Sequence, residues 1–385
     1  MTPPGWDGRV DDELDAVRAA GRWRVVRDLD ATGPVTGTVE GRPVVSFAAN
    51  DYLGLTHHPA VVAAAHAALD RWGAGSGASR LVVGSRPVHG ELESELAAWK
   101  ASEAALLFPT GFAANLGVLA ALGGPDMTIL SDELNHASIV DGARLARAGV
   151  RVYRHGDLDH LAKLLVEVDA EARGPALVVS DSAFSMDGDV ADVAGLGELC
   201  AAHDALLVLD EAHAVLGPAV VRGAGARVLR VGTLSKALGA LGGFVAGPRR
   251  YVDLLRNRAR PFIFTPAPTP ADTAAGLAAL RVVRSAEGAA LVARLRAHVD
   301  RLRPGHPTPI VPVVLGEEAA ALAAAEALLA AGLLVPAIRP PTVAPGTSRL
   351  RVALSAAHTG DQVDRLAAAL AALPGPAGGT GVAPA

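Results

Sequence analysis

The chain is poor in several residue types, and each shortage narrows what the protein can be. Its 385 residues include one cysteine and three lysines, and aromatic residues make up 4%. A single cysteine excludes a disulfide framework, and Cys200 stands in an apolar helical pattern that predicts a buried structural thiol. The formal net charge of −5 lacks the basic excess of nucleic-acid-binding proteins, so we expect no nucleic-acid partner.

Long apolar runs are also scarce. Residues 1–15 are polar and acidic with no apolar stretch, which argues against a signal peptide. Residues 319–338 resemble a membrane segment, but glutamates, Gly332 and Pro336 interrupt or flank them, so we expect a packed helix followed by a strand. The sequence therefore predicts a cytoplasmic protein with no membrane partner. It has no P-loop, HExxH or CxxC motif, and we expect no metal site.

Short apolar runs alternate with helical patterns through the middle of the chain. Such alternation predicts βαβ units and an α/β fold with a mostly parallel, buried central sheet. The strands are expected at 104–108, 128–130, 150–153, 177–180, 206–209, 228–231 and 243–246. After the prolines at 266–270 the pattern changes to a long helical region, 271–302. Strands at 309–314, 333–337 and 350–354, with helices at 317–331 and 361–373, then predict a smaller α+β part.

These patterns predict four segments. Residues 1–45 form an N-terminal arm with a helix at 11–26, and residues 46–265 form the large domain. Residues 266–373 form the small domain, and residues 374–385 form a Gly/Pro/Ala tail that we expect to be disordered.

Lys236 is the most informative residue. Asp210 and His213 end an apolar run, and about two dozen residues later a second apolar run leads into Thr233 and Lys236. In α/β sheets, ligands bind beyond the carboxyl ends of strands. The order suits pyridoxal phosphate (PLP), because a lysine forms a Schiff base with its aldehyde and an acid keeps its pyridine nitrogen protonated.

Three further loops carry candidate cofactor contacts. Gly111 and Phe112 begin a helix after a strand, and free N–H groups at such a helix start attract phosphate, although the segment could also be a plain strand-to-helix turn. His136, in the next strand-to-helix loop, could stack on the pyridine ring or could cap the helix. Ser185 could bond the cofactor, or its loop could be a plain turn built on Asp187 and Gly188.

Arg351 lies in the strand predicted at 350–354. An arginine pointing inward from a strand usually holds a carboxylate through two hydrogen bonds. The alternative is a surface arginine on an edge strand. Arg349 lies two residues earlier, so a choice between the two is needed, and we select Arg351.

Together these motifs resemble the α-oxoamine synthases, a PLP-dependent family of fold type I, over nearly the whole chain. The resemblance rests on NDYLGL at 50–55, GSG at 75–77, GFAAN at 111–115, HAS at 136–138, FSMDG at 184–188, DEAH at 210–213 and TLSK at 233–236. It implies a homodimer in which Lys236 carries the cofactor. The other implied cofactor contacts are Asp210 with the pyridinium, His213 with the ring oxygen, His136 on the ring, Ser185, Thr233, and Gly111 and Phe112 beside the phosphate.

The same resemblance implies the substrates. The segment AIRPPTV at 337–343 is similar to the biotin-pathway branch, which uses L-alanine and pimeloyl-CoA or pimeloyl-acyl-carrier protein. Arg351 would then bind the amino-acid carboxylate, and Arg24 and Thr342 would contact the acyl group. For Arg24, a place on a solvated helix face stays open. The alternative is another branch of the family, such as glycine C-acetyltransferase. A non-catalytic relative could dispense with Lys236, so the presence of this lysine argues against that class.

Two segments depart from the family pattern. A hydroxyl-rich run that usually reaches the neighbouring subunit's phosphate reads FIFTPAPTP at 262–270, with Pro266 and Ala267 in place of hydroxyls. Thr265 is left as the candidate for that contact. After His213 the chain reads AVLG where a Gly-Thr/Ser-Gly type of segment is commoner, so acyl-substrate handling could differ.

Overall fold

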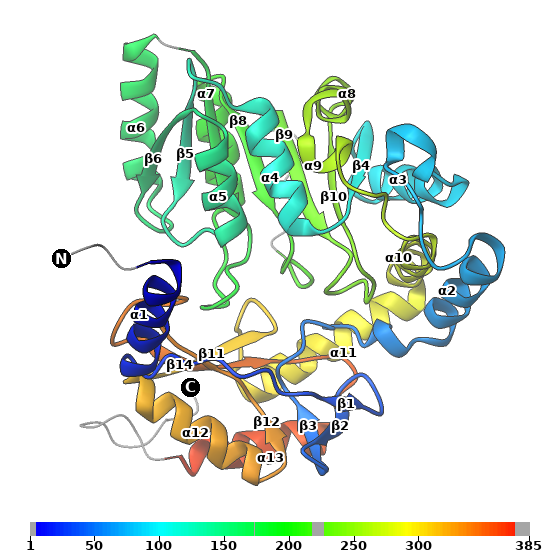
Figure 1. The fold of residues 1–385 in the computed structure, drawn as a ribbon, viewed down its shortest axis with the longest axis vertical. Coiled ribbons are helices and arrows are strands. Elements are labelled where there is room, and N and C mark those ends of the chain that lie inside the picture. Colours follow the sequence, from blue (N-terminus) through cyan, green and yellow to red (C-terminus); the bar gives the residue numbers. More distant parts are fainter. Residues whose placement is uncertain (1–4, 173, 218–226, 374–385) are drawn as a thin grey trace.

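A seven-stranded sheet organises the middle of the chain. The structure is a computed structural model that describes residues 5–172, 174–217 and 227–373, and the predicted tail at 374–385 lies outside them. The strands run in the order β4-β10-β9-β8-β7-β5-β6 (Figure 1). Their bounds are β4 Ala104–Phe108, β5 Thr128–Asp132, β6 Gly149–Tyr153, β7 Ala176–Asp181, β8 Leu206–Asp210, β9 Arg227–Thr233 and β10 Gly243–Gly247.

The predicted mostly parallel sheet is confirmed. Strands β9, β8, β7, β5 and β6 pair in parallel, while β10 runs antiparallel to both β4 and β9. Parallel strands align their carboxyl ends, so the loops after β5, β7 and β8 open at one edge of the sheet. The predicted site residues His136, Ser185 and Asp210 lie at this edge.

Helices cover both faces of this sheet, which explains its near-continuous apolar strands. One face packs under α4 Gly111–Leu122, α5 Ala137–Leu145, α8 Arg249–Arg258 and α9 Arg260–Ile263. The other packs under α6 Leu158–Glu171 and α7 Val193–Ala202. Alternate strand residues serve alternate faces: Leu177 joins the first core and Val178 the second. Cys200 on α7 is fully buried, as predicted, and burial raises the pKa of its thiol to about 12.

Figure 1 shows the N-terminal arm beside the C-terminal part of the chain, below the large sheet. Strand β3 pairs in parallel with β12, joining the two ends of the sequence in one four-stranded sheet, β1-β2-β3-β12. A three-stranded sheet has the order β11-β14-β13. The elements are α1 Trp6–Ala19, β1 Asp30–Ala31, β2 Thr36–Val39, β3 Arg42–Ser46, β11 Ile310–Gly316, α12 Glu318–Ala330, β12 Leu333–Leu334, β13 Ala337–Ile338, β14 Ser348–Ala353 and α13 Gly360–Ala371.

Four helices and two short turns link these parts. They are η1 Leu55–His57, α2 Pro59–Trp72, the π-helical turn η2 Arg80–Gly84, α3 Pro87–Trp99, α10 Pro270–Val283 and α11 Ala286–Leu302. Buried residues of α3, α10 and α11 share one core with the C-terminal sheets. The domain limits expected at residues 45, 265 and 373 stay a prediction.

Three expectations at the level of elements were wrong. The helix expected at 11–26 runs instead over Trp6–Ala19 and stops before Gly21, whose φ of +64° lies in the left-handed region that favours glycine at helix ends. The strand expected at 333–337 is divided between two sheets, because Pro336 lacks an N–H and separates β12 from β13. The helical region 271–302 breaks at Arg284 and Ser285, and Ser285 caps the new helix α11. No helix within the described ranges is long and apolar enough to span a bilayer.

Candidate active site

The loop between β9 and β10 presents Lys236 at the edge of the large sheet. Its shape is set by short-range hydrogen bonds: Thr233 Oγ1 accepts from the Ser235 amide at 3.1 Å, and the Lys236 carbonyl accepts from the Gly239 amide at 3.0 Å. Gly239 has a φ of +59°, and a Cβ there would lie 2.6 Å from the Thr56 amide nitrogen. A side chain at this position would therefore push the lysine loop away from η1.

Lys236 begins a chain of hydrogen bonds that leads into the protein. Its Nζ lies 2.8 Å from His213 Nε2, and His213 Nδ1 lies 2.6 Å from the Tyr52 hydroxyl. Burial lowers the pKa of Lys236, partly offset by Asp210 and Asp181, and burial with the nearby lysine charge lowers the pKa of His213 well below its usual range. A neutral imidazole next to an amine of lowered pKa suits a lysine that must give up its proton.

Asp210 ends β8 and is held by two donors. Its Oδ2 accepts from Asn115 Nδ2 at 2.6 Å, and its Oδ1 accepts from the Ala212 amide at 2.9 Å. Asn115 reaches it from α4 and also donates to Ser138 at 2.9 Å. Within the part of the chain that the structure describes, this buried carboxylate forms no ion pair.

A second buried carboxyl group lies beside Asp210. Asp181 ends β7, and the two residues are register partners on neighbouring strands. Burial and the charge of Asp210 raise the pKa of Asp181 well above its usual range. Asp181 Oδ2 accepts from the His136 backbone amide at 2.8 Å, which fixes the start of the loop that carries the imidazole.

The start of α4 has free backbone amides at the position where phosphate binding is predicted. Thr110 caps the helix by accepting from the Ala113 amide at 3.0 Å, which leaves the amides of Gly111 and Phe112 without a partner among the described residues. A Cβ on Gly111 would lie 3.3 Å from Thr233 Cβ, so this helix start is packed against the lysine loop. The exposed Phe112 ring meets the exposed His136 ring edge-on, with centroids 6.3 Å apart. His136 also caps α5, so the alternative of a capping role is realised in the structure.

Arg351 contacts the loop that carries Ser185. Arg351 Nε donates to the Ser185 carbonyl at 2.5 Å, and its Nη2 donates to Asn50 Oδ1 at 3.1 Å. The Tyr52 hydroxyl donates to the same Asn50 oxygen at 3.1 Å, so Arg351 joins the chain that ends at Lys236. Arg349 instead forms an ion pair with Asp187. Among described residues Arg351 has no carboxylate partner, which favours it over Arg349 as the ligand of a substrate carboxylate.

These residues fit pyridoxal phosphate. A protonated pyridine nitrogen would be a positively charged partner for the neighbouring carboxyl groups of Asp210 and Asp181. The free amides of Gly111 and Phe112 suit a phosphate. Asn115 Oδ1 is buried with no hydrogen-bond partner, a further sign of a polar site that the chain alone does not complete. The residues that would hold the cofactor are Lys236, Asp210, His213, His136, Thr233, Gly111, Phe112 and Ser185.

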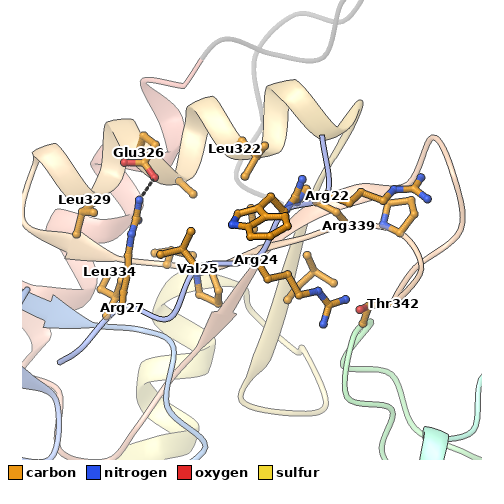
Figure 2. Close-up of a pocket in the computed structure, with 17 residues that line it drawn as sticks. Arg22, Arg24, Val25, Arg27, Leu322, Glu326, Leu329, Leu334, Arg339 and Thr342 are labelled. Carbon is orange, nitrogen blue, oxygen red and sulfur yellow. Dashed lines mark hydrogen bonds and ion pairs between the residues drawn. The ribbon is translucent and has the colours of Figure 1, made fainter. Parts of the chain in front are cut away.

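Arg24 and Thr342 lie together in a cavity of about 560 Å³ that none of the other predicted site residues lines. The cavity is lined by residues 22–25 and 27, by α12, and by residues 334–340 and 342. Figure 2 shows the Arg24 side chain pointing toward Thr342. Arg24 does not lie on a helix, contrary to expectation, because α1 ends at Ala19. The cavity borders the strand of Arg351, since the Arg351 amide donates to the carbonyl of its lining residue Pro336 at 3.0 Å.

Thr265, the residue predicted to contact the phosphate of the neighbouring subunit, is half-buried. Thr265 donates its hydroxyl to the Pro261 carbonyl, which leaves the oxygen able to accept a further hydrogen bond. Its neighbour Phe264 is 67% exposed. The role of Thr265 stays a prediction.

Sequence reasoning assigned no role to four residues that the structure places at the site. They are Asn50, Tyr52, Asn115 and Asp181. Three of them stand in motifs already singled out, at 50–55 and 111–115. Asp181 had a usable signal, because it ends β7 as Asp210 ends β8, and neighbouring parallel strands bring such residues side by side.

Replacing Arg351 by glutamine is expected to raise KM for the amino acid far more than KM for the acyl donor. Loss of a buried two-point contact with a carboxylate costs about 2–4 kcal/mol, or roughly 30-fold to 1,000-fold in affinity. Steady-state kinetics with each substrate varied in turn would measure this. Arg349→Gln is the matched control, and an equal or larger effect there would transfer the role to Arg349.

Comparisons with known proteins agree with this geometry. Residues 42–370 match the family aminotransferase class I and II. The 8-amino-7-oxononanoate synthases of Anaeromyxobacter dehalogenans and Methylobacterium nodulans are 53% and 49% identical over 380 and 375 residues, covering 94% and 96% of this chain and 94% and 97% of theirs. A serine palmitoyltransferase of S. paucimobilis, solved with PLP and myriocin bound, superposes with a TM-score of 0.86 at 28% identity, covering 94% of this chain and 95% of that one. The chain therefore belongs to the aminotransferase class I and II family of PLP-dependent enzymes and, within it, to the α-oxoamine synthases of the 8-amino-7-oxononanoate synthase type.

Proposed function

We propose that the protein condenses L-alanine with a pimeloyl thioester, releasing CO2 and the free thiol and giving 8-amino-7-oxononanoate for biotin biosynthesis. The thioester is pimeloyl-CoA or pimeloyl-acyl-carrier protein. The observation that carries the choice of donor is Arg24, which shares a cavity with Thr342 and has no ion-pair partner among the described residues. A long dicarboxylic chain needs such a cation at its far end, whereas an acetyl group does not.

The chemistry at the amino acid depends on Lys236. When bound, PLP supplies an electron sink that stabilises negative charge at the Cα of alanine. Lys236 Nζ takes the Cα proton, and its lowered pKa makes the neutral amine accessible for this step. His213, 2.8 Å from Nζ and neutral, holds the amine in place without competing for positive charge.

Two residues orient the substrates. Arg351, buried and without a carboxylate partner among the described residues, binds the alanine carboxylate and so places Cα near Lys236. His136, whose backbone is fixed by Asp181, donates to the oxygen that gains charge when the thioester is attacked. These contacts restrict the reaction to an α-amino acid held at its carboxylate.

The cavity around Arg24 favours the pimeloyl donor. Arg22, Arg27 and Arg339 line the same cavity, and each forms an ion pair with a glutamate of α12. Arg24 has no such partner among described residues. It can therefore bind an incoming carboxylate without first breaking an ion pair, and Thr342 can add a hydroxyl donor.

The test compares acyl donors at a fixed alanine concentration. Pimeloyl-CoA is expected to react faster than succinyl-CoA or acetyl-CoA, and Arg24→Ala is expected to reduce this preference. Thiol release measures the rate. Faster turnover of acetyl-CoA with glycine would move the protein to glycine C-acetyltransferase, while a pimeloyl preference unchanged by Arg24→Ala would remove that residue from the site.

We also propose that the protein is a homodimer. Leu81, Val82, Val83 and Phe264 are exposed apolar residues on two adjacent segments, since Ser79 bridges to Pro266. A second copy covering this surface would bring Thr265 near its neighbour's phosphate. Light scattering is expected to give the mass of two chains; full activity at the mass of one chain would contradict the proposal. The cytoplasmic location stays a prediction.

A further inference from the structure

Residues 22–29, here called the arginine strap, carry Arg24 past the cavity without regular secondary structure. The strap follows α1 and precedes β1. Within the described ranges, the backbone of residues 23–29 forms no hydrogen bond with other backbone groups. Nearly all of its residues are exposed. Its position therefore depends on side-chain contacts.

Two glutamates of α12 supply those contacts. Arg22 Nη2 lies 2.9 Å from Glu318 Oε1, and Arg27 Nη2 lies 2.6 Å from Glu326 Oε1. The glutamates are eight residues apart, about two helical turns, so they lie along one face of α12. Figure 2 shows the pair of Arg27 and Glu326 well away from Thr342, with Arg24 pointing the other way.

Glu318 has a second arginine partner, Arg339, in the segment that follows β13. Its Oε2 lies 3.7 Å from Arg339 Nη1, and that same nitrogen donates to the Gly21 carbonyl at 2.9 Å. Arg339 in turn accepts a hydrogen bond at its own carbonyl from the Thr342 amide at 3.0 Å. One carboxylate thus links the start of the strap to the segment that ends in Thr342.

This arrangement sets both the position and the charge of the cavity. Arg24 lies two residues after Arg22, and Thr342 lies three residues after Arg339, so Glu318 fixes the approach of each. Its charge also offsets two arginines, which would otherwise repel one another and compete with Arg24 for an incoming anion. Glu326 does the same for Arg27.

We propose that Glu318 is a positioning residue for recognition of the acyl donor's distal carboxylate. It holds the arginine strap and the segment 339–342 so that Arg24 and Thr342 face the same point of the cavity. This inference rests on the proposed function, because it takes the distal carboxylate of a dicarboxylic acyl chain as the ligand. It adds a residue that touches neither the cofactor nor the substrate.

The test compares Glu318→Ala with Glu317→Ala, its neighbour at the start of α12, which has no ion pair among the described residues. The donors are pimeloyl-CoA and heptanoyl-CoA, which has the same chain length without the distal carboxylate. Glu318→Ala is expected to raise KM for pimeloyl-CoA about tenfold, the scale of one part-exposed ion pair and the contact it orients. KM for heptanoyl-CoA and alanine should change less than about twofold, within the usual effect of a surface substitution.

Limited digestion of the purified protein with trypsin gives a second readout that needs no turnover, because trypsin cleaves after arginine and the strap contains Arg24. Cleavage within residues 22–29 is expected to be faster in Glu318→Ala and to keep the wild-type rate in Glu317→Ala. Glu318→Gln, which keeps one acceptor for Arg22, should fall between them and serves if the alanine variant fails to fold. A general loss of stability would affect all three substrates alike.

The outcomes separate the two proposals. A wild-type protein that does not distinguish pimeloyl-CoA from heptanoyl-CoA contradicts the proposed function itself. A wild-type preference that Glu318→Ala leaves unchanged overturns the role of Glu318, whether or not tryptic cleavage of the strap has accelerated. Loss of the preference together with faster cleavage of the strap, both absent in the Glu317 variant, supports it.

Discussion

Replacement of Lys236 by alanine is expected to abolish turnover and the covalent attachment of the cofactor. The residue supplies both the amine that holds PLP and the base that takes the Cα proton, so its loss removes two functions at once. Borohydride reduction of the wild-type protein should fix the cofactor on one lysine. Mass spectrometry of the peptides then identifies which.

The chain has three lysines, so the site of cofactor attachment can be assigned without ambiguity. Only Lys100 and Lys163 compete with Lys236 for attachment. Lys100 is engaged in an ion pair of 2.6 Å with Glu211, and Lys163 lies on α6, which covers the large sheet. Lys163→Ala is the matched control and should retain full activity. A reduced adduct at either of these two lysines in the wild-type protein would overturn the assignment.

Replacement of Asp210 by asparagine is expected to leave PLP binding measurable and to reduce kcat by several powers of ten. An amide cannot stabilise a protonated pyridine, and loss of a buried charge partner costs several kcal/mol. Each 1.4 kcal/mol in the barrier is about tenfold in rate. Cofactor absorbance would measure binding, and thiol release would measure turnover.

Asp181→Asn provides a comparison on the adjacent strand. Its carboxyl group has a raised pKa, and an asparagine oxygen can still accept from the His136 amide. The same substitution should therefore cost much less here than at Asp210. Near wild-type rates in Asp210→Asn, or a larger loss in Asp181→Asn, would show that the pyridinium partner had been misassigned.

Much of the site could be predicted because its residues lie at the ends of predictable strands. Asp210, Ser185 and His136 each follow an apolar run, and parallel strands bring such ends to one edge of a sheet. Lys236 was conspicuous because lysines are rare in this chain.

The rest depends on contacts between segments far apart in the sequence. Tyr52 meets His213 across 161 residues, and Arg351 meets Asn50 across 301, which no local pattern reveals. Arg24 was placed on a helix because apolar residues continue at helical spacing to residue 26. The helix ends at Ala19 instead, before Gly21 with its positive φ, and the strap that follows forms ion pairs with α12 through Arg22 and Arg27.

The neighbouring acids Asp181 and Asp210 affect the stability of the protein before PLP binds. Burial of two adjacent carboxyl groups, which already raises the pKa of Asp181, disfavours the folded state at this edge of the sheet. A bound cationic ring relieves this effect, and a ligand that binds only the folded state stabilises it by mass action. Cofactor supply and resistance to unfolding are thereby coupled, so chains that find no PLP are the ones most open to proteolysis.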